Sequence, residues 1–225
     1  MKKTVYSLVL SEDVVAAIDR LAYHKGTNRS GLINQILAEY VSYVTPEKRM
    51  RDIFGRMEAL LDGRDSFHVQ MTQSDSLFAL RSALDFKYNP TLRYSVELYR
   101  APAADGAFGE LRVTLRTQNS TLLLYLLQFY KLWHSVEERF LGASVHDRLE
   151  DGGKYLRQLG LRAVVRGADT ASAGSETLGE LIAAYIRTFD AALKAYFYHL
   201  NDPSAAAVEV ERIYRDYLTE STLVL

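Results

Sequence analysis

The residue types that most often carry catalysis or bind metals occur in this chain, but their spacing fits neither task. The five histidines are scattered, no two of them lie four residues apart, and no nearby carboxylate completes a metal-binding pattern. They are His24, His68, His134, His146 and His199. A glycine-rich phosphate loop and a Gly-x-Ser-x-Gly elbow are both missing from the sequence. We therefore expect a protein that is not an enzyme and that has no metal site and no cofactor.

Two pairs of adjacent acids could in principle work together as acid and base. They are Glu137-Glu138 and Glu150-Asp151. Both pairs fall in segments that we expect to be helical, on faces that we expect to be exposed. The simpler interpretation is that they are solubilising charge.

Composition places the charge that could bind nucleic acid near the start of the chain. The formal net charge of all 225 residues is −1, so the chain as a whole is not a basic, nucleic-acid-coating protein. Residues 1–51, however, hold eight lysines and arginines against five acids, an excess of three positive charges. A local excess of this kind is what contact with phosphate requires.

Residues 3–10 are rich in β-branched and aromatic side chains and predict a short β-strand. One face of this strand would be apolar and carry Tyr6, Leu8 and Leu10. The opposite face would carry Lys3, Val5, Ser7 and Val9. Ser11 then follows as the N-cap of a helix, with acids in the first turn.

Two amphipathic helices follow this strand. The first has apolar residues at helical spacing and ends at Lys25-Gly26, and Asn28 is a natural N-cap for the second. The apolar positions are Val14, Val15, Ile18, Leu21 and Ala22 in the first helix, and Leu32, Ile33, Ile36, Leu37, Tyr40 and Val41 in the second. A unit of about 40 residues rarely closes a core alone, so we expect it to form a dimer.

The run KKTVYSLVLSEDVVAAIDRLAYHKGTNRSGLINQILAEY, within residues 1–44, resembles the ribbon-helix-helix DNA-binding regulators of the MetJ, Arc and CopG type. The resemblance implies that two chains pair their strands into an antiparallel ribbon that enters the major groove of double-stranded DNA. It also implies that the start of the second helix contacts a phosphate. The residues that it assigns to DNA binding are Lys2, Lys3, Val5, Ser7, Val9, Asn28, Arg29 and Ser30.

The outward face of the strand departs from the usual pattern of this family, in which the matching positions are polar or basic. Val5 and Val9 offer only apolar contact, for instance to a thymine methyl group, which leaves Lys3 and Ser7 as readers of base edges. A second hypothesis follows. The strand-helix-helix unit would serve only for dimerisation, in a non-enzymatic adaptor or assembly protein whose two valines contact protein.

The remainder of the chain predicts a larger α+β domain. Thr45-Pro46-Glu47 begins a helix in the favoured way, and residues 46–63 form an amphipathic connecting helix between a domain at 1–45 and a domain at 64–225. Between residues 66 and 117 the pattern alternates, which indicates a four-stranded antiparallel sheet. The expected strands are 66–72, 77–86, 92–100 and 109–117.

One face of the predicted sheet would be apolar and the other polar. The apolar face would carry Phe67, Val69, Met71, Phe78, Leu80, Leu84, Tyr94, Val96, Leu98, Leu111, Val113 and Leu115. The polar face, rich in arginine, would carry His68, Gln70, Thr72, Arg81, Arg93, Ser95, Glu97, Tyr99, Arg112, Thr114 and Arg116. The simpler interpretation is that this polar face is exposed to solvent, because solvated sheet faces have such a composition. The alternative is that it forms a site for an anion or a partner.

Helices between residues 120 and 219 would cover the apolar face. A buried helix over 120–141 is expected to place Trp133, Tyr125, Phe129 and Tyr130 in the core, and a weaker helix is expected over 144–160. Residues 167–175 predict a loop, Thr177 and Glu180 a capping box for a helix to Leu200, and 205–219 a last helix.

Charged residues interrupt the apolar run within 120–141 before the ~20 residues that a membrane crossing needs, so no membrane span is expected there. The start of the chain lacks the apolar run of a secretory signal. With no cysteine in the sequence, a cytoplasmic location is expected. The sequence thus predicts a cytoplasmic, dimeric DNA-binding regulator. Its larger domain would sense a small-molecule effector of unknown chemistry or join dimers into a higher oligomer.

Overall fold

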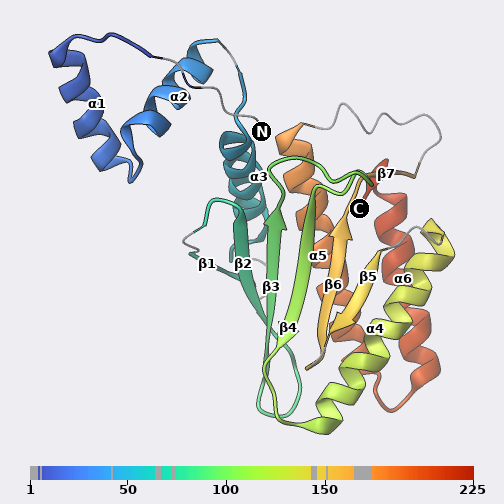
Figure 1. The fold of residues 1–225 in the computed structure, drawn as a ribbon. Helices are drawn as coiled ribbons and strands as arrows, with labels where there is room; N and C mark the ends of the chain where they lie inside the picture. The colour runs from blue at the N-terminus through green and yellow to red at the C-terminus, as the bar shows by residue number, and fades with distance from the viewer. Residues whose placement is uncertain are drawn as a thin grey trace. The chain divides into compact units, whose positions relative to one another are not determined.

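The chain folds into two units, residues 1–49 and residues 50–225. The computed structural model describes residues 5, 7–41, 43–63, 67–71, 74–142, 146–150, 152–164 and 174–225, without the side chain of Glu176. The fold class is α+β, as predicted, and the described residues include six helices and a six-stranded antiparallel sheet (Figure 1).

The first unit contains the two predicted helices, α1 (Glu12–His24) and α2 (Arg29–Tyr40). Gly26 separates them with a φ of 62°, a left-handed conformation that glycine adopts without the penalty of a Cβ atom. Asn28 caps α2 as expected, since its side-chain oxygen accepts a hydrogen bond from the backbone nitrogen of Gly31 at 2.7 Å.

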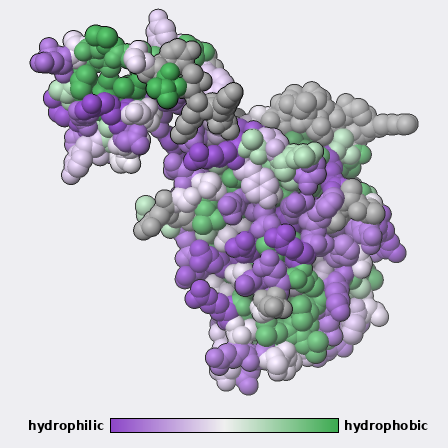
Figure 2. All heavy atoms as spheres, viewed as in Figure 1, coloured by the Kyte–Doolittle hydropathy of each residue, from purple (hydrophilic) through white to green (hydrophobic). Residues whose placement is uncertain are grey.

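Most of the apolar residues of this unit are exposed in the single chain. Of the eleven helix positions predicted to face inward, only Ala22 and Leu32 are buried. Residue 5 and residues 7–10 form no strand, and no other described segment pairs with them. Tyr6 lies outside the described residues. Figure 2 shows hydrophobic residues of this unit gathered at its surface.

The second unit is built on a sheet in which β1 (Phe67–Gln70), β2 (Leu77–Ala83), β3 (Thr91–Leu98) and β4 (Gly109–Leu115) form the predicted meander. The order of the strands is β1-β2-β3-β4-β6-β5. The predicted apolar face is largely buried, with Val69 partly exposed. Met71 is an exception, since its exposed fraction of 104% places it in solvent just past the end of β1.

The prediction of a helix over 144–160 is wrong, and so is the prediction that the sheet has four strands. The segment contains β5 (Asp147–Glu150) and β6 (Lys154–Leu159), which pair as a hairpin and join the sheet next to β4. The cause is the pair Gly152-Gly153, with φ of 78° and 72°. Two left-handed residues in a row make a hairpin turn and would break a helix.

Four helices pack on the core face of the sheet: α3 (Pro46–Leu61), α4 (Ser120–Leu141), α5 (Ser175–Tyr198) and α6 (Pro203–Thr219). In Figure 1 the strands lie in front of α5. Phe129, Tyr130 and Trp133 are buried in this core and Tyr125 packs against it, as predicted. A short second sheet pairs β7 (Arg162–Ala163) with β8 (Leu223–Val224). Within the described residues, no helix has the length and apolarity that crossing a membrane demands.

The predicted capping box at the start of α5 is wrong. The helix begins at Ser175 after Gly174, which has no side chain to form a cap. Glu180 instead accepts a hydrogen bond from Arg56 Nε on α3, at 3.1 Å, and so joins two helices. The last helix begins at Pro203, with Asp202 as its cap. Most of the predicted loop at 167–175 lies outside the described residues.

Gly179 sets how closely α3 approaches α5. A Cβ atom on Gly179 would lie 2.8 Å from the backbone oxygen of Ile53 and 2.8 Å from Cβ of Arg56. We expect Gly179→Ala to lower the free energy of unfolding by about 1–3 kcal/mol, because the two helices must move apart. Urea denaturation of the full chain measures this change.

Gly55 on α3 is the matched control, since a Cβ atom there would meet nothing within 4 Å. Gly55→Ala should leave the free energy of unfolding unchanged or raise it by up to about 1 kcal/mol, through better helix propensity. Equal effects of the two substitutions would contradict the close approach of α3 to α5.

Candidate functional site

The residues predicted to read DNA bases lie at the surface of the first unit. Val5 and Val9 have exposed fractions of 95% and 101%, and Ser7 is exposed as well. Lys2 and Lys3, the remaining members of this set, lie outside the described residues. In one chain these positions form no base-reading surface, because the ribbon that would present them requires a second strand.

The three residues predicted to contact phosphate lie together at the start of α2 and are exposed. Asn28 uses its side chain to cap the helix. The backbone N–H groups of a first helical turn have no acceptor within the helix, and the positive end of the helix dipole lies there, so the position suits an anion.

Arg29 already has a carboxylate partner. Its Nε donates to Oδ1 of Asp19 on α1 at 2.6 Å, and its Nη2 forms a second hydrogen bond to Oδ2. This hydrogen bond lowers the pKa of Asp19 and raises the pKa of Arg29. Solvent screens an exposed ion pair such as this one and makes it weak, so a phosphate group can compete with Asp19 for the guanidinium.

The second unit holds a buried ionic cluster around Glu137 of α4. Glu137 is 0% exposed and Arg157 of β6 is 1% exposed. Arg157 donates from Nε to Oε2 at 3.2 Å and from Nη2 to Oε1 at 3.2 Å. Tyr185 of α5 donates to Oε1 at 3.0 Å and in turn accepts from Trp133 Nε1 at 3.0 Å.

Arg157 extends this cluster to the last strand. Its Nη2 donates to the backbone oxygen of Leu225 at 3.1 Å, and its Nη1 to that of Gln158 at 2.7 Å. Burial, followed by the charge of Glu137, raises the pKa of Tyr185 well above 10, so its hydroxyl stays a donor at neutral pH. The cluster therefore links α4, α5, β6 and Leu225, the residue after β8. The polar atoms named above have their hydrogen-bond partners within the cluster.

A second buried carboxylate, Asp190 of α5, has a similar structural role. It accepts from Tyr94 Oη at 2.7 Å and from Ser82 Oγ at 3.1 Å, both on the core face of the sheet. Lys194 Nζ lies 2.6 Å from its Oδ2. Burial and the charge of Asp190 raise the pKa of Tyr94 well above 10. Each carboxylate is thus balanced by a cation and by neutral donors, as buried charges require.

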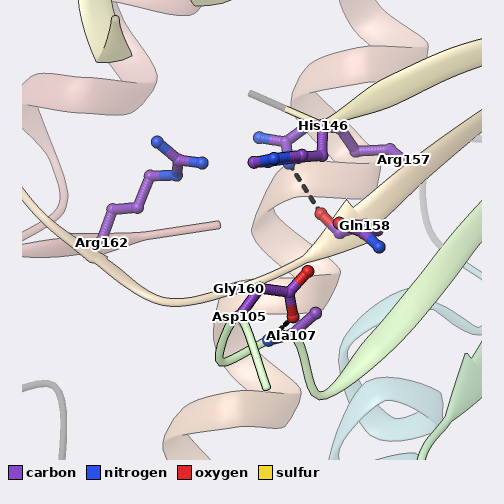
Figure 3. Close-up of a pocket in the computed structure, with 7 residues that line it drawn as sticks. All are labelled: Asp105, Ala107, His146, Arg157, Gln158, Gly160 and Arg162. Carbon is purple, nitrogen blue, oxygen red and sulfur yellow. Dashed lines mark hydrogen bonds between the residues drawn. The ribbon is translucent and has the colours of Figure 1, made fainter. Parts of the chain in front are cut away.

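A small hollow of about 130 Å3 opens beside Arg157. It is lined by Asp105, Ala107, His146, Arg157, Gln158, Gly160 and Arg162. In Figure 3 the Arg162 side chain extends toward His146 and Arg157, while Asp105 lies across the hollow beside Ala107. Burial and the nearby Arg157 lower the pKa of Arg162. Organic ligands usually occupy about 300–1,000 Å3, so this space suits water or a small ion.

A larger and more open hollow of about 790 Å3 lies between the β2–β3 turn and the end of α5. Its lining is Ala83, Leu84, Asp85, Asn89, Lys194, Ala195, Tyr198, His199 and Glu209. The volume falls in the range of small-molecule sites. Among the described residues, no group of three or more histidines and acids could hold a metal ion.

Comparison with known proteins adds no relative: no family model, no curated protein and no solved structure matches this chain. Any assignment of function therefore depends on its own residues and contacts.

The interpretation of Glu137 as exposed, solubilising charge is wrong. Its neighbour Glu138 is exposed as expected, and so is Glu150, while Asp151 lies outside the described residues. The sequence did contain a sign of this burial, because position 137 has apolar neighbours on its helix. Two of them, Trp133 and Val136, are buried. A carboxylate in a helix that is apolar nearly all round has to find a buried partner.

Glu137→Gln tests the ionic cluster. The substitution keeps the size of the side chain but leaves Arg157 buried without a counter-charge, so the free energy of unfolding should fall by about 3–5 kcal/mol. Urea denaturation at pH 7 measures it. Glu138→Gln, one residue away and exposed, should change stability by less than about 0.5 kcal/mol. Similar, small effects of both variants would show that the cluster is not needed for stability.

Proposed function

We propose that this chain is a sequence-specific DNA-binding regulator that acts as a homodimer through residues 1–44. In this proposal two copies pair residues 3–10 into an antiparallel ribbon, with α1 and α2 of both chains packed behind it. The ribbon enters the major groove, and the start of α2 contacts a phosphate on either side.

The observation that carries the proposal is the exposed apolar surface of the first unit. Leu8 and Leu10 on the predicted strand are 58% and 40% exposed, and Val14, Leu21, Ile36 and Leu37 on the helices are 42–52% exposed. These are the positions that a ribbon and four interlocked helices would bury. A second copy of the same chain would bury these side chains, because an isologous interface uses the same surface of both copies.

Charge and helix geometry favour DNA as the ligand of such a dimer. The excess of three positive charges in residues 1–51 doubles on dimerisation. The first turn of α2, capped by Asn28, would present its backbone N–H groups and the Arg29 side chain to the phosphate backbone of DNA. Within this proposal the second unit senses a ligand or adds oligomer contacts, and the open hollow at Lys194 and His199 is the place where an effector of moderate size would fit.

An adaptor protein is the second candidate, and the near-complete exposure of Val5 and Val9 favours it. If the outward face of the ribbon contacts another protein, both valine side chains would be buried against it. In a DNA groove they would find apolar contact only at a thymine methyl group. The two candidates predict opposite results for affinity toward DNA at low salt, where a regulator binds even non-specific sequences.

The decisive experiment measures binding of the full chain to genomic fragments by fluorescence anisotropy over a series of salt concentrations. Arg29→Ala should weaken binding to all sequences alike, and because it frees one phosphate in each half of the dimer, the salt slope should decrease by about 1.8. Asp19→Asn should do the reverse and raise affinity, because it releases Arg29 and removes a negative charge. Absence of binding at low salt would favour the adaptor.

Ser7→Ala provides a contrasting change on the strand. Loss of a groove-facing hydroxyl should relax the preference for one base pair in each half-site, while non-specific affinity and the salt slope stay nearly constant. A uniform loss of affinity over all sequences would show that Ser7 contacts the backbone, contrary to its predicted place on the ribbon.

A further inference from the structure

The solvent-facing side of the sheet carries a row of basic side chains across its first three strands. The strand register places His68 opposite Arg81, and Arg81 opposite Arg93. All three are exposed. Neighbouring strands are about 4.8 Å apart, so the two arginines bring their charges together on one flat surface. We call His68, Arg81, Arg93 and the nearby Arg116 the basic patch.

Two like charges directly opposite each other destabilise a sheet unless a counter-charge lies close. Among the described residues, no carboxylate forms an ion pair or hydrogen bond with Arg81, Arg93 or Arg116. The other half of the same face is arranged differently. There Arg112 and Arg148 each lie within 3.4 Å of a Glu110 oxygen, and Arg148 also approaches Glu150. Among the described residues, this face therefore has one half whose arginines are paired with carboxylates and one half whose arginines are not.

The form of the basic patch indicates the kind of ligand. Its residues line neither of the two hollows described above, and they lie side by side on neighbouring strands of the sheet. The described helices that contact this sheet pack on its opposite, apolar face. Figure 2 shows mainly hydrophilic residues over the strands. A flat array of guanidinium groups matches an extended polyanion with phosphate groups at regular spacing.

We infer that the basic patch is a second DNA-contact surface, which binds the phosphate backbone without reading sequence. This inference rests on the proposed function, since it assigns to the second unit a share in DNA binding. It gives a reason for two opposed arginines that have no carboxylate partner among the described residues. Their mutual repulsion is relieved when DNA phosphates lie between them, and release of counterions then adds to affinity.

The test compares the full chain of 225 residues with a double variant, Arg81→Gln with Arg93→Gln. Affinity for all DNA sequences should fall by about tenfold or more at 0.1 M salt, and the salt slope should decrease by about 0.9 for each phosphate that the variant no longer neutralises. Arg112→Gln with Arg148→Gln is the matched control, because these two arginines lie on the same face but are paired with Glu110 and Glu150; this variant should retain most of the affinity and slope. Arg81→Lys with Arg93→Lys should retain most of the slope.

The outcomes that would overturn the inference alone can be told apart from failure of the proposed function. If the wild-type chain binds DNA and the double glutamine variant binds it equally well, the basic patch is not a DNA contact. If the wild-type chain binds vesicles containing phosphatidylserine, and the double variant loses this binding alone, the ligand is a lipid surface. If the wild-type chain binds no DNA at all, the proposed function fails first, and the inference with it.

Discussion

The constraint on which this structure depends is apolar surface that one chain cannot bury. Among the described residues of the first unit, the buried apolar side chains are Ala22, Leu32 and Ala38. Leucines and valines of the strand segment and of both helices remain exposed. At about 25 cal/mol for each Å2 of apolar surface removed from water, covering these side chains would be a large favourable term. The proposed second copy would cover this surface, and its two-fold symmetry would place the starts of two α2 helices as a symmetric pair.

The second unit has the opposite character, since its core closes within one chain. Its sheet buries one face under α3 to α6, and the buried charges of Glu137 and Asp190 each find a cation and hydroxyl donors. Buried ion pairs are seldom net stabilising relative to an apolar core, but they fix which elements lie together. Glu137 does this for α4, α5 and β6. The sheet of this unit carries the basic patch on the face opposite this core.

Much of the second unit could be predicted from local pattern, and the exceptions have physical causes. The meander β1 to β4 follows from alternation between turns, and its buried face agrees with the pattern except at Met71, where β1 has already ended. The hairpin β5–β6 was missed because the charged run around Asp147 and Glu150 has no apolar alternation, so only the Gly152-Gly153 turn marks it. For the candidate site, the Asn28 cap was visible in the sequence. The pairing of Arg29 with Asp19 was not, because it joins positions ten residues apart whose relation only the packing of two helices determines.

The central claim, that residues 3–10 of two copies pair as an antiparallel ribbon, is tested most directly by a cysteine scan. The chain has no cysteine, so single cysteines placed in turn at positions 5 to 9 give five variants with one thiol each. In an antiparallel ribbon the position nearest the two-fold axis faces its own copy, with Cβ atoms about 4.5–5.5 Å apart, close enough for a disulfide after slight adjustment. Mild oxidation should give a covalent dimer in high yield at one position, with the yield falling on both sides of it. A one-chain mass by sedimentation, with no covalent dimer at any of the five positions, would contradict the account.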